Sequence, residues 1–255
     1  MPLGERETHP YLEQGQIIGA TKLILGSFPV YDCTDNDNDL KKQNRQNKGT
    51  VRFFYGSYRN SLWIKYSQFI DNTISKPWNT ELILESLRKR KIAVSDTILS
   101  CERYKYKIDK KTGTKILFPY SSEDSALKNK NWNRVIIRTL INNGVTKILC
   151  TSKGVLNDLE RQIICFGRNN YGRKDNQLSS LFQSQFIERV GGNNNQITND
   201  IAKIFIVGNS QIIAIALPSP GAPQRQTHEF GCNNQNRLEY SENYFQNAFN
   251  WLLND

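Results

Sequence analysis

Three short apolar runs constrain the fold of this 255-residue chain more than any other feature. They extend from Lys22 to Leu25, from Lys147 to Cys150 and from Ile212 to Leu217, and each is bounded by turn residues. Long segments with helical patterning separate the runs, which is typical of buried parallel strands joined by crossover helices. The sequence therefore predicts an α/β fold.

A fourth apolar run, from Ile204 to Val207, is followed by a Gly208-Asn209 turn, which predicts antiparallel pairing with the next run and hence a mixed sheet. The length suits one large domain, residues 1–255. Helices are predicted at Leu62–Ile70, Thr80–Arg90, Trp132–Asn142 and Glu242–Leu253. The last of these helices should close the core, because one of its faces carries Phe245, Ala248, Phe249 and Leu252.

A polar segment from Asp32 to Lys48 predicts a surface loop, over about residues 32–50, with no role in the core. Within it, Asp35 to Asp39 imitates the start of a calcium-binding loop. However, Leu40 stands where such a loop needs Gly, and Gln46 where it needs a bidentate Glu. We therefore predict no calcium site.

The chain carries 34 Lys and Arg against 24 Asp and Glu, a formal charge of +10. This balance favours a polyanionic partner, nucleic acid first, although many basic soluble proteins have no such partner. The five cysteines are scattered without C-x-x-C pairs, so we expect reduced thiols and no metal. The polar N-terminal segment and the absence of long apolar runs predict neither a signal peptide nor a membrane span, and hence a cytoplasmic protein.

Open parallel sheets bind ligands at the carboxyl ends of their strands, so the segments that follow the apolar runs are the candidates for a site. The first run is followed by Gly26-Ser27-Phe28-Pro29 and then, after a polar loop, by the segment from Phe54 to Trp63. The last run is followed by a Pro-rich loop that starts at Leu217 and ends at Pro223.

Three of these segments, taken together, resemble the uracil-DNA glycosylase superfamily. They are the strand followed by G-x-x-P, the aromatic-G-x-x-R-N-x-x-W segment and the L-P-S-P loop. The mismatch-specific and hypoxanthine-DNA glycosylase branches are the most similar, and the S-C-E-R segment within Ile92 to Asp109 resembles the latter. The likeness runs in order from about residue 20 to residue 225. It implies a three-layer α/β/α sandwich with a mainly parallel four-stranded sheet, whose first and last motif loops face each other across a DNA-binding cleft.

The resemblance also implies a monofunctional glycosylase that flips an altered base out of DNA and hydrolyses its N-glycosidic bond, leaving an abasic site. We expect a monomer that needs no cofactor, metal or membrane and acts on DNA containing a damaged or modified base.

Two residues are candidates for holding the attacking water, since Phe28 occupies the position where many relatives have Asp or Asn. Asn60 comes first, because it matches the catalytic Asn of the hypoxanthine-type branch, but it is also a plausible N-cap for the helix near Leu62. Asp96 is the second candidate, with a structural turn as the alternative.

Further roles follow from the resemblance and from the strand ends. Phe28 and Tyr55 are candidates for stacking on the base, with core packing as the alternative. Thr151 and Ser152 stand where an Asn often reads the base edge. The complete base-binding set is Gly26, Ser27, Phe28, Tyr55, Thr151 and Ser152. The DNA-binding set is Arg59, Pro218, Ser219, Pro220, Gly221, Gln224 and Arg225.

The target base stays open at this stage: hypoxanthine, uracil, another lesion or a modified base such as those of phage DNA, in single or double strands. Leu217 replaces the His that many relatives carry before the P-S loop. Together with Phe28 and Thr151, it predicts a poor uracil enzyme. The main alternative is a catalytically inactive DNA-binding module on the same scaffold. A metal-dependent nuclease ranks last, because clustered carboxylates are lacking.

Overall fold

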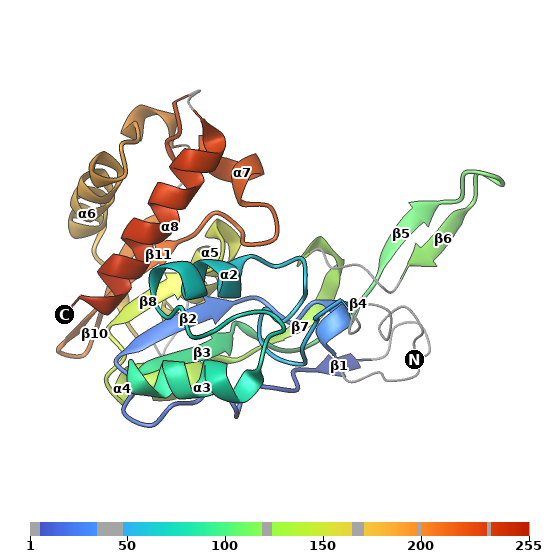
Figure 1. The fold of residues 1–255 in the computed structure, drawn as a ribbon, viewed down its shortest axis with the longest axis horizontal. Coiled ribbons are helices and arrows are strands. Elements are labelled where there is room, and N and C mark those ends of the chain that lie inside the picture. Colours follow the sequence, from blue (N-terminus) through green and yellow to red (C-terminus); the bar gives the residue numbers. More distant parts are fainter. Residues whose placement is uncertain are drawn as a thin grey trace.

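The computed structural model describes residues 6–34, 48–118, 124–164, 171–197, 200–233 and 236–254. Its central feature is a six-stranded sheet with the order β3-β2-β8-β11-β10-β9 (Figure 1). The strands are β2 (Lys22–Gly26), β3 (Ile92–Asp96), β8 (Lys147–Cys150), β9 (Arg173–Lys174), β10 (Ala202–Val207) and β11 (Ser210–Ala216).

The α/β class predicted from the sequence is confirmed, but the four-stranded sheet is wrong. Strands β3, β2, β8 and β11 are parallel to one another. The sheet then continues past β11, because β10 pairs antiparallel with β11 and the short β9 pairs antiparallel with β10. The hairpin expected at Gly208-Asn209 is thus present, and it extends the sheet.

Seven α-helices are present among the described residues. They are α2 (Leu62–Phe69), α3 (Thr80–Lys89), α4 (Arg134–Asn142), α5 (Lys153–Ile163), α6 (Asn176–Arg189), α7 (Pro223–Gln226) and α8 (Arg237–Leu253). The four predicted helices are confirmed, whereas α5, α6 and α7 were not predicted. No helix in the described part of the chain is both long and apolar enough to cross a membrane.

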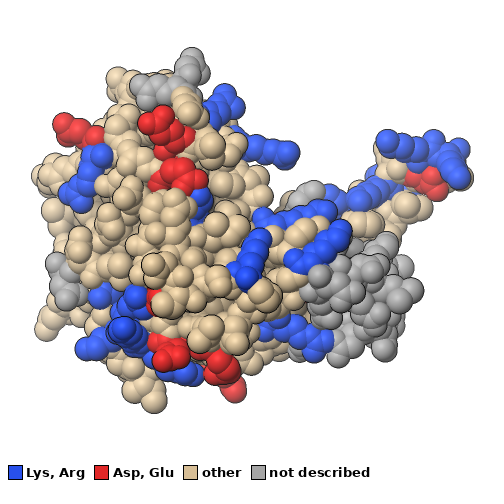
Figure 2. All heavy atoms as spheres, viewed as in Figure 1, with Lys and Arg blue, Asp and Glu red and all other residues tan. Residues whose placement is uncertain are grey.

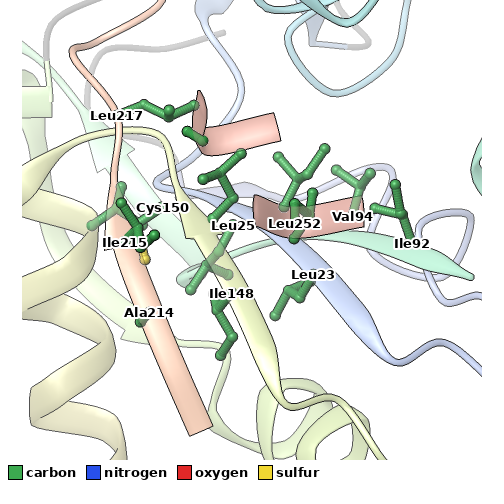
Figure 3. Close-up of a cluster of buried hydrophobic side chains, with 14 of the residues drawn as sticks. Leu23, Leu25, Ile92, Val94, Ile148, Cys150, Ala214, Ile215, Leu217 and Leu252 are labelled. Carbon is green, nitrogen blue, oxygen red and sulfur yellow. The ribbon is translucent and has the colours of Figure 1, made fainter. Parts of the chain in front are cut away.

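The core lies on both faces of the central sheet. Consecutive residues Leu23, Ile24 and Leu25 of β2 are all fully buried, so each face must be covered. In Figure 1, α2 and α8 lie over one face, while α5 packs against β8, β10 and β11. Figure 3 shows Leu252 of α8 among the side chains of β2 and β3. The apolar face predicted for this last helix is fully buried: Phe245, Ala248, Phe249 and Leu252.

A smaller antiparallel sheet adjoins the carboxyl ends of the central strands. It contains β1 (Arg6–Thr8), β4 (Ile98–Arg103) and β7 (Leu127–Trp132), in the order β1-β4-β7. Only Thr97 separates β3 from β4, so Asp96 lies at the junction of the two sheets. A two-stranded hairpin, β5 (Lys105–Ile108) and β6 (Lys115–Phe118), continues from β4 and projects from the body (Figure 1).

The polar segment predicted to lack a core role is partly buried at its start. Tyr31–Cys33 form a 3-10 helix in which Asp32 and Cys33 are 7% and 1% exposed. The Tyr11 hydroxyl donates a hydrogen bond to the Cys33 carbonyl, which fixes this turn against the core. The prediction is therefore wrong for Asp32 and Cys33. Residues 35–47, with the calcium-like sequence, lie outside the described residues.

A partly buried ion pair joins the segment after α2 to the end of α3 and should make stability depend on pH. Arg90 Nη1 lies 2.8 Å from Asp71 Oδ2, and Ser86 Oγ donates to the same oxygen at 2.6 Å. Burial alone would raise the pKa of Asp71, but hydrogen bonds from Ser86 and Thr73 and the Arg90 charge lower it to about 2. The folded pKa is therefore below the unfolded value, so this stabilisation is present above about pH 4 and is lost toward pH 2.

Asp71→Asn is therefore expected to lower the free energy of unfolding by about 2 kcal/mol at pH 7. The deficit relative to the parent should shrink as the pH falls from 4 to 2, and urea unfolding at several pH values measures it. Glu85→Gln, which changes an exposed acid of α3, is the matched control. A deficit that stays constant down to pH 2 would contradict this origin of the stability.

Candidate active site

A pocket of about 510 Å³ opens at the carboxyl ends of the parallel strands. This volume is within the range of small-ligand sites, and the position is the one expected for an open α/β sheet. The lining residues are Ser27, Phe28, Pro29, Val30, Asp32, Tyr55, Ser57, Arg59, Asn60, Asp96, Asp124, Thr151, Ser152, Ser219, Pro220, Gly221 and Arg225. The pocket thus brings together all the predicted site residues except Gly26, Pro218 and Gln224.

Asp96, the last residue of β3, is held on one side by a buried histidine. His9 Nε2 lies 2.8 Å from Asp96 Oδ2, and neither side chain is more than 4% exposed. His9 Nδ1 accepts the backbone N–H of Tyr11 at 3.1 Å, so the ring proton is assigned to Nε2, which donates to the carboxylate. The His9 ring packs against Phe28 and Phe54, with centroids 5.5 and 5.0 Å away. The imidazole therefore has one fixed orientation.

Tyr55 holds the other oxygen of the same carboxylate. Its hydroxyl lies 3.3 Å from Asp96 Oδ1. Burial, followed by the charge of Asp96, raises the pKa of Tyr55 well above its ordinary value, so the phenol keeps its proton and donates it. Tyr55 also has a φ of 54°, a left-handed conformation that is costly for a bulky residue and is often found at functional sites.

Gly26 does not line the pocket but makes the contact between Tyr55 and Asp96 possible. A Cβ atom at Gly26 would lie 1.8 Å from Tyr55 Oη and 2.2 Å from Asp96 Oδ1. Gly26 pairs with Asp96 across β2 and β3, so its bare backbone forms the floor beneath the two side chains. Any larger residue at this position would displace one of them.

Asn60 lines the pocket and also has a structural role. Its Oδ1 accepts the N–H of Leu62, the first residue of α2, at 2.8 Å. The neighbouring Ser61 donates from both its backbone N–H and its hydroxyl to the Pro220 carbonyl, at 3.1 and 2.7 Å. The second motif segment is thus fixed to the Pro-rich loop. Asp96 is the better acceptor for a water in this pocket, because a carboxylate has about four acceptor sites and can take a proton, whereas the Asn60 amide has one oxygen, already bonded to the Leu62 N–H, and cannot act as a base.

Asp124, which the sequence analysis did not identify, adds a further carboxyl group to the wall. Ser27 Oγ donates to Asp124 Oδ1 at 2.8 Å. Desolvation by the surrounding protein raises the pKa of Asp124. The hydrogen bond from Ser27 lowers this pKa, and the negative charge of Asp96 raises it further. Asp124 thus holds a proton more readily than an ordinary aspartate does. Among the described residues, no three His, Cys, Asp or Glu side chains converge as metal ligands.

Phe28 and the residues after β8 have both packing and pocket contacts. Phe28 is 7% exposed and belongs to a small core with Ile98, Cys101 and Leu127; the Arg103 guanidinium lies 5.6 Å from its ring centroid. Ser152 Oγ accepts the Val155 N–H at 3.2 Å and caps α5, which leaves the hydroxyl proton available to a ligand.

The loop after β11 forms one wall of the pocket. Gln226 Oε1 accepts the Ser219 N–H at 2.9 Å and so stabilises the loop from α7. Pro218 is buried, and Gln224 is exposed on α7. His228 has a side-chain exposure of 62% and does not line the pocket.

Comparison of the chain with protein-family models, curated proteins and solved structures found no significant match.

Proposed function

We propose that this protein is a DNA glycosylase of the uracil-DNA glycosylase superfamily, which hydrolyses the N-glycosidic bond of a flipped, altered base. The observation that carries the proposal is the Asp96 carboxylate, held by His9 and Tyr55 at the end of a parallel strand inside a pocket of about 510 Å³. The ordered series of motifs supports the same superfamily, because its segments line this one pocket. The four adjacent parallel strands are compatible with the superfamily's fold.

Asp96 suits the task of activating water. It would accept a hydrogen bond from the water and take its proton while the new O–C1′ bond forms and the C1′–N bond breaks. The bonding electrons leave with the base, and the negative carboxylate stabilises the positive charge that develops on the sugar. His9 and Tyr55 would keep the carboxylate aimed at the water throughout, since each oxygen has its own donor.

The remaining polar groups suit recognition of a base edge. Thr151 and Ser152 offer hydroxyl groups that can donate hydrogen bonds, and the Ser27 hydroxyl, which donates to Asp124, can accept one. Such donors would bind the acceptor atoms of a base and stabilise the electrons it carries away. We propose that these residues, rather than an Asn, read the substrate.

The outer wall of the pocket suits DNA that has been opened at one nucleotide. Pro220 and Gly221 form a loop fixed by Ser61, and a rigid loop of this kind can press into a duplex. Arg59 and Arg225 are exposed and line the pocket, where they would bind the phosphates beside the flipped nucleotide.

A panel of oligonucleotides tests the proposal, each containing one altered base and each treated with alkali after incubation to cleave abasic sites. The panel should include uracil, hypoxanthine, bulky pyrimidines and phage-type modified bases, in single and double strands. At least one base should be released by the parent protein and not by Asp96→Asn prepared in parallel. DNA binding without release of any base would favour the alternative, an inactive DNA-binding module.

Uracil is expected to be released about 10³-fold more slowly than the best substrate, or more slowly still. Phe28, Thr151 and Leu217 replace the water holder, the uracil-reading Asn and the His of strong uracil enzymes, and each lost polar contact costs about 1 to 4 kcal/mol in the transition state. Leu217 is also fully buried and absent from the pocket wall. Time courses under single-turnover conditions measure the ratio, and equal rates on uracil and the best substrate would contradict the interpretation.

A further inference from the structure

We propose that the β5–β6 hairpin is an arm that binds the phosphates of a DNA duplex several base pairs from the flipped nucleotide. This inference rests on the proposed function in one respect, namely that the partner is DNA. None of the hairpin residues lines the pocket.

The hairpin carries a strong excess of positive charge. Between Lys105 and Phe118 it carries five lysines and one acid, Asp109. The acid shapes the turn, because Asp109 Oδ1 accepts the N–H of Lys111 at 2.8 Å. Lys107, Lys110, Lys111 and Lys115 are exposed, and Figure 2 shows basic side chains along the projecting hairpin and on the adjoining part of the body. A polyanion is therefore the partner that its charge favours.

Apolar side chains are exposed on both faces of the hairpin. Tyr106 and Ile108 of one face are 62% and 69% exposed, and Ile116 of the other is 45% exposed. An isolated two-stranded hairpin is marginally stable, so a projecting one gains stability when a partner covers it. A two-stranded ribbon has the width of the DNA major groove, where apolar side chains contact base edges and lysines reach the flanking phosphates. The lysine excess favours such a duplex over an apolar protein surface.

The base of the hairpin is fixed to the pocket wall. Arg103, at the end of β4, donates from Nη2 to the Pro29 carbonyl at 2.6 Å, and its guanidinium lies over the Phe28 ring. Arg103 Nε also pairs with the buried Glu7 carboxylate at 3.0 Å. Strand β5, from Lys105 to Ile108, then extends roughly 14 Å, the length of about four base pairs. The arm thus reaches DNA beyond the nucleotide in the pocket.

The test compares two double variants that remove the same charge. Lys110→Gln/Lys111→Gln alters the hairpin turn, and Arg88→Gln/Lys89→Gln alters exposed residues at the end of α3, which lies at the amino edge of the sheet, opposite the pocket. Affinity for a duplex with one abasic-site analogue is measured from low to high salt. The slope of log K against log salt should become shallower by about 1 to 2 for the hairpin variant and stay unchanged for the α3 variant.

Duplex length gives a second readout. Removing about four base pairs from one flank should weaken binding of the parent and of the α3 variant, but change that of the hairpin variant much less. Thermal unfolding of each variant confirms that the fold is intact. If the parent and the hairpin variant bind DNA with the same salt slope, the proposal that the hairpin is a DNA-binding arm is overturned. A hairpin-dependent slope without release of any base would instead support the arm and contradict the glycosylase.

Discussion

Replacement of Asp96 by Asn is expected to slow base release by about 10³-fold with little change in DNA affinity or thermal stability. The amide has the shape of the carboxylate, so its oxygen can still accept the His9 Nε2–H and its NH₂ group can face the Tyr55 hydroxyl. What disappears is the negative charge and the capacity to take a proton from water. Single-turnover rates on the best substrate and titrations with a non-cleavable analogue separate the two effects.

Two variants of the same pocket are controls for this prediction. Asp124→Asn removes another of the three aspartate carboxyls that line the pocket, and should cost less than Asp96→Asn if Asp96 is the water-activating group. Asn60→Ala removes the hydrogen bond to the Leu62 N–H, and should lower the free energy of unfolding by about 1 kcal/mol, as loss of a helix cap does. A larger rate loss for Asn60→Ala than for Asp96→Asn would restore Asn60 as the water holder, the order that the sequence alone favoured.

The parts of the fold that could be predicted are those with a local pattern. The runs that became β2, β8 and β11 are apolar because both faces of a central strand are buried, so they can be recognised without knowing their partners. Since parallel strands all end at one edge, the residues after them could also be expected to meet, and Ser27, Thr151 and Ser219 do line one pocket.

His9 could not be predicted as part of the site, because nothing local indicates its burial. It follows the three-residue strand β1 in a charged and polar segment. Its position depends on antiparallel pairing of β1 with β4, and on a hydrogen bond from its own N–H to the Leu99 carbonyl at 2.9 Å. Such contacts, across some 90 residues of sequence, leave no periodicity in either segment. The one available signal was that the chain has only two histidines.

The β5–β6 hairpin escaped prediction for the opposite reason. A strand is recognised from alternation between a buried and a solvated face, and this hairpin has no buried face. Its lysines alternate with Tyr106 and Ile108 on two uncovered surfaces, so the segment resembles a polar loop. The Asp124 carboxyl was missed similarly, because it lies in a polar connection before β7.

Replacement of His9 by Phe is expected to lower kcat by about 10²-fold while KM and DNA affinity stay close to those of the parent. Phenylalanine keeps a ring between Phe28 and Phe54 but removes the N–H that holds Asp96 Oδ2. The carboxylate would then be held by Tyr55 alone and could rotate away from the water. His9→Gln, which restores an N–H donor, should recover part of the rate, a result that loss of packing alone would not produce.

The double variant His9→Phe/Asp96→Asn decides whether the histidine acts through the carboxylate. If the only catalytic role of His9 is to orient Asp96, its loss has nothing further to impair once Asp96 can no longer accept a proton. The double variant should then be about as slow as Asp96→Asn alone, rather than slower by the product of the two single effects. Multiplicative losses would show that His9 acts independently of Asp96. If His9→Phe instead kept the full rate but had a lowered Tm, the role of His9 would be only to stabilise the junction between the two sheets.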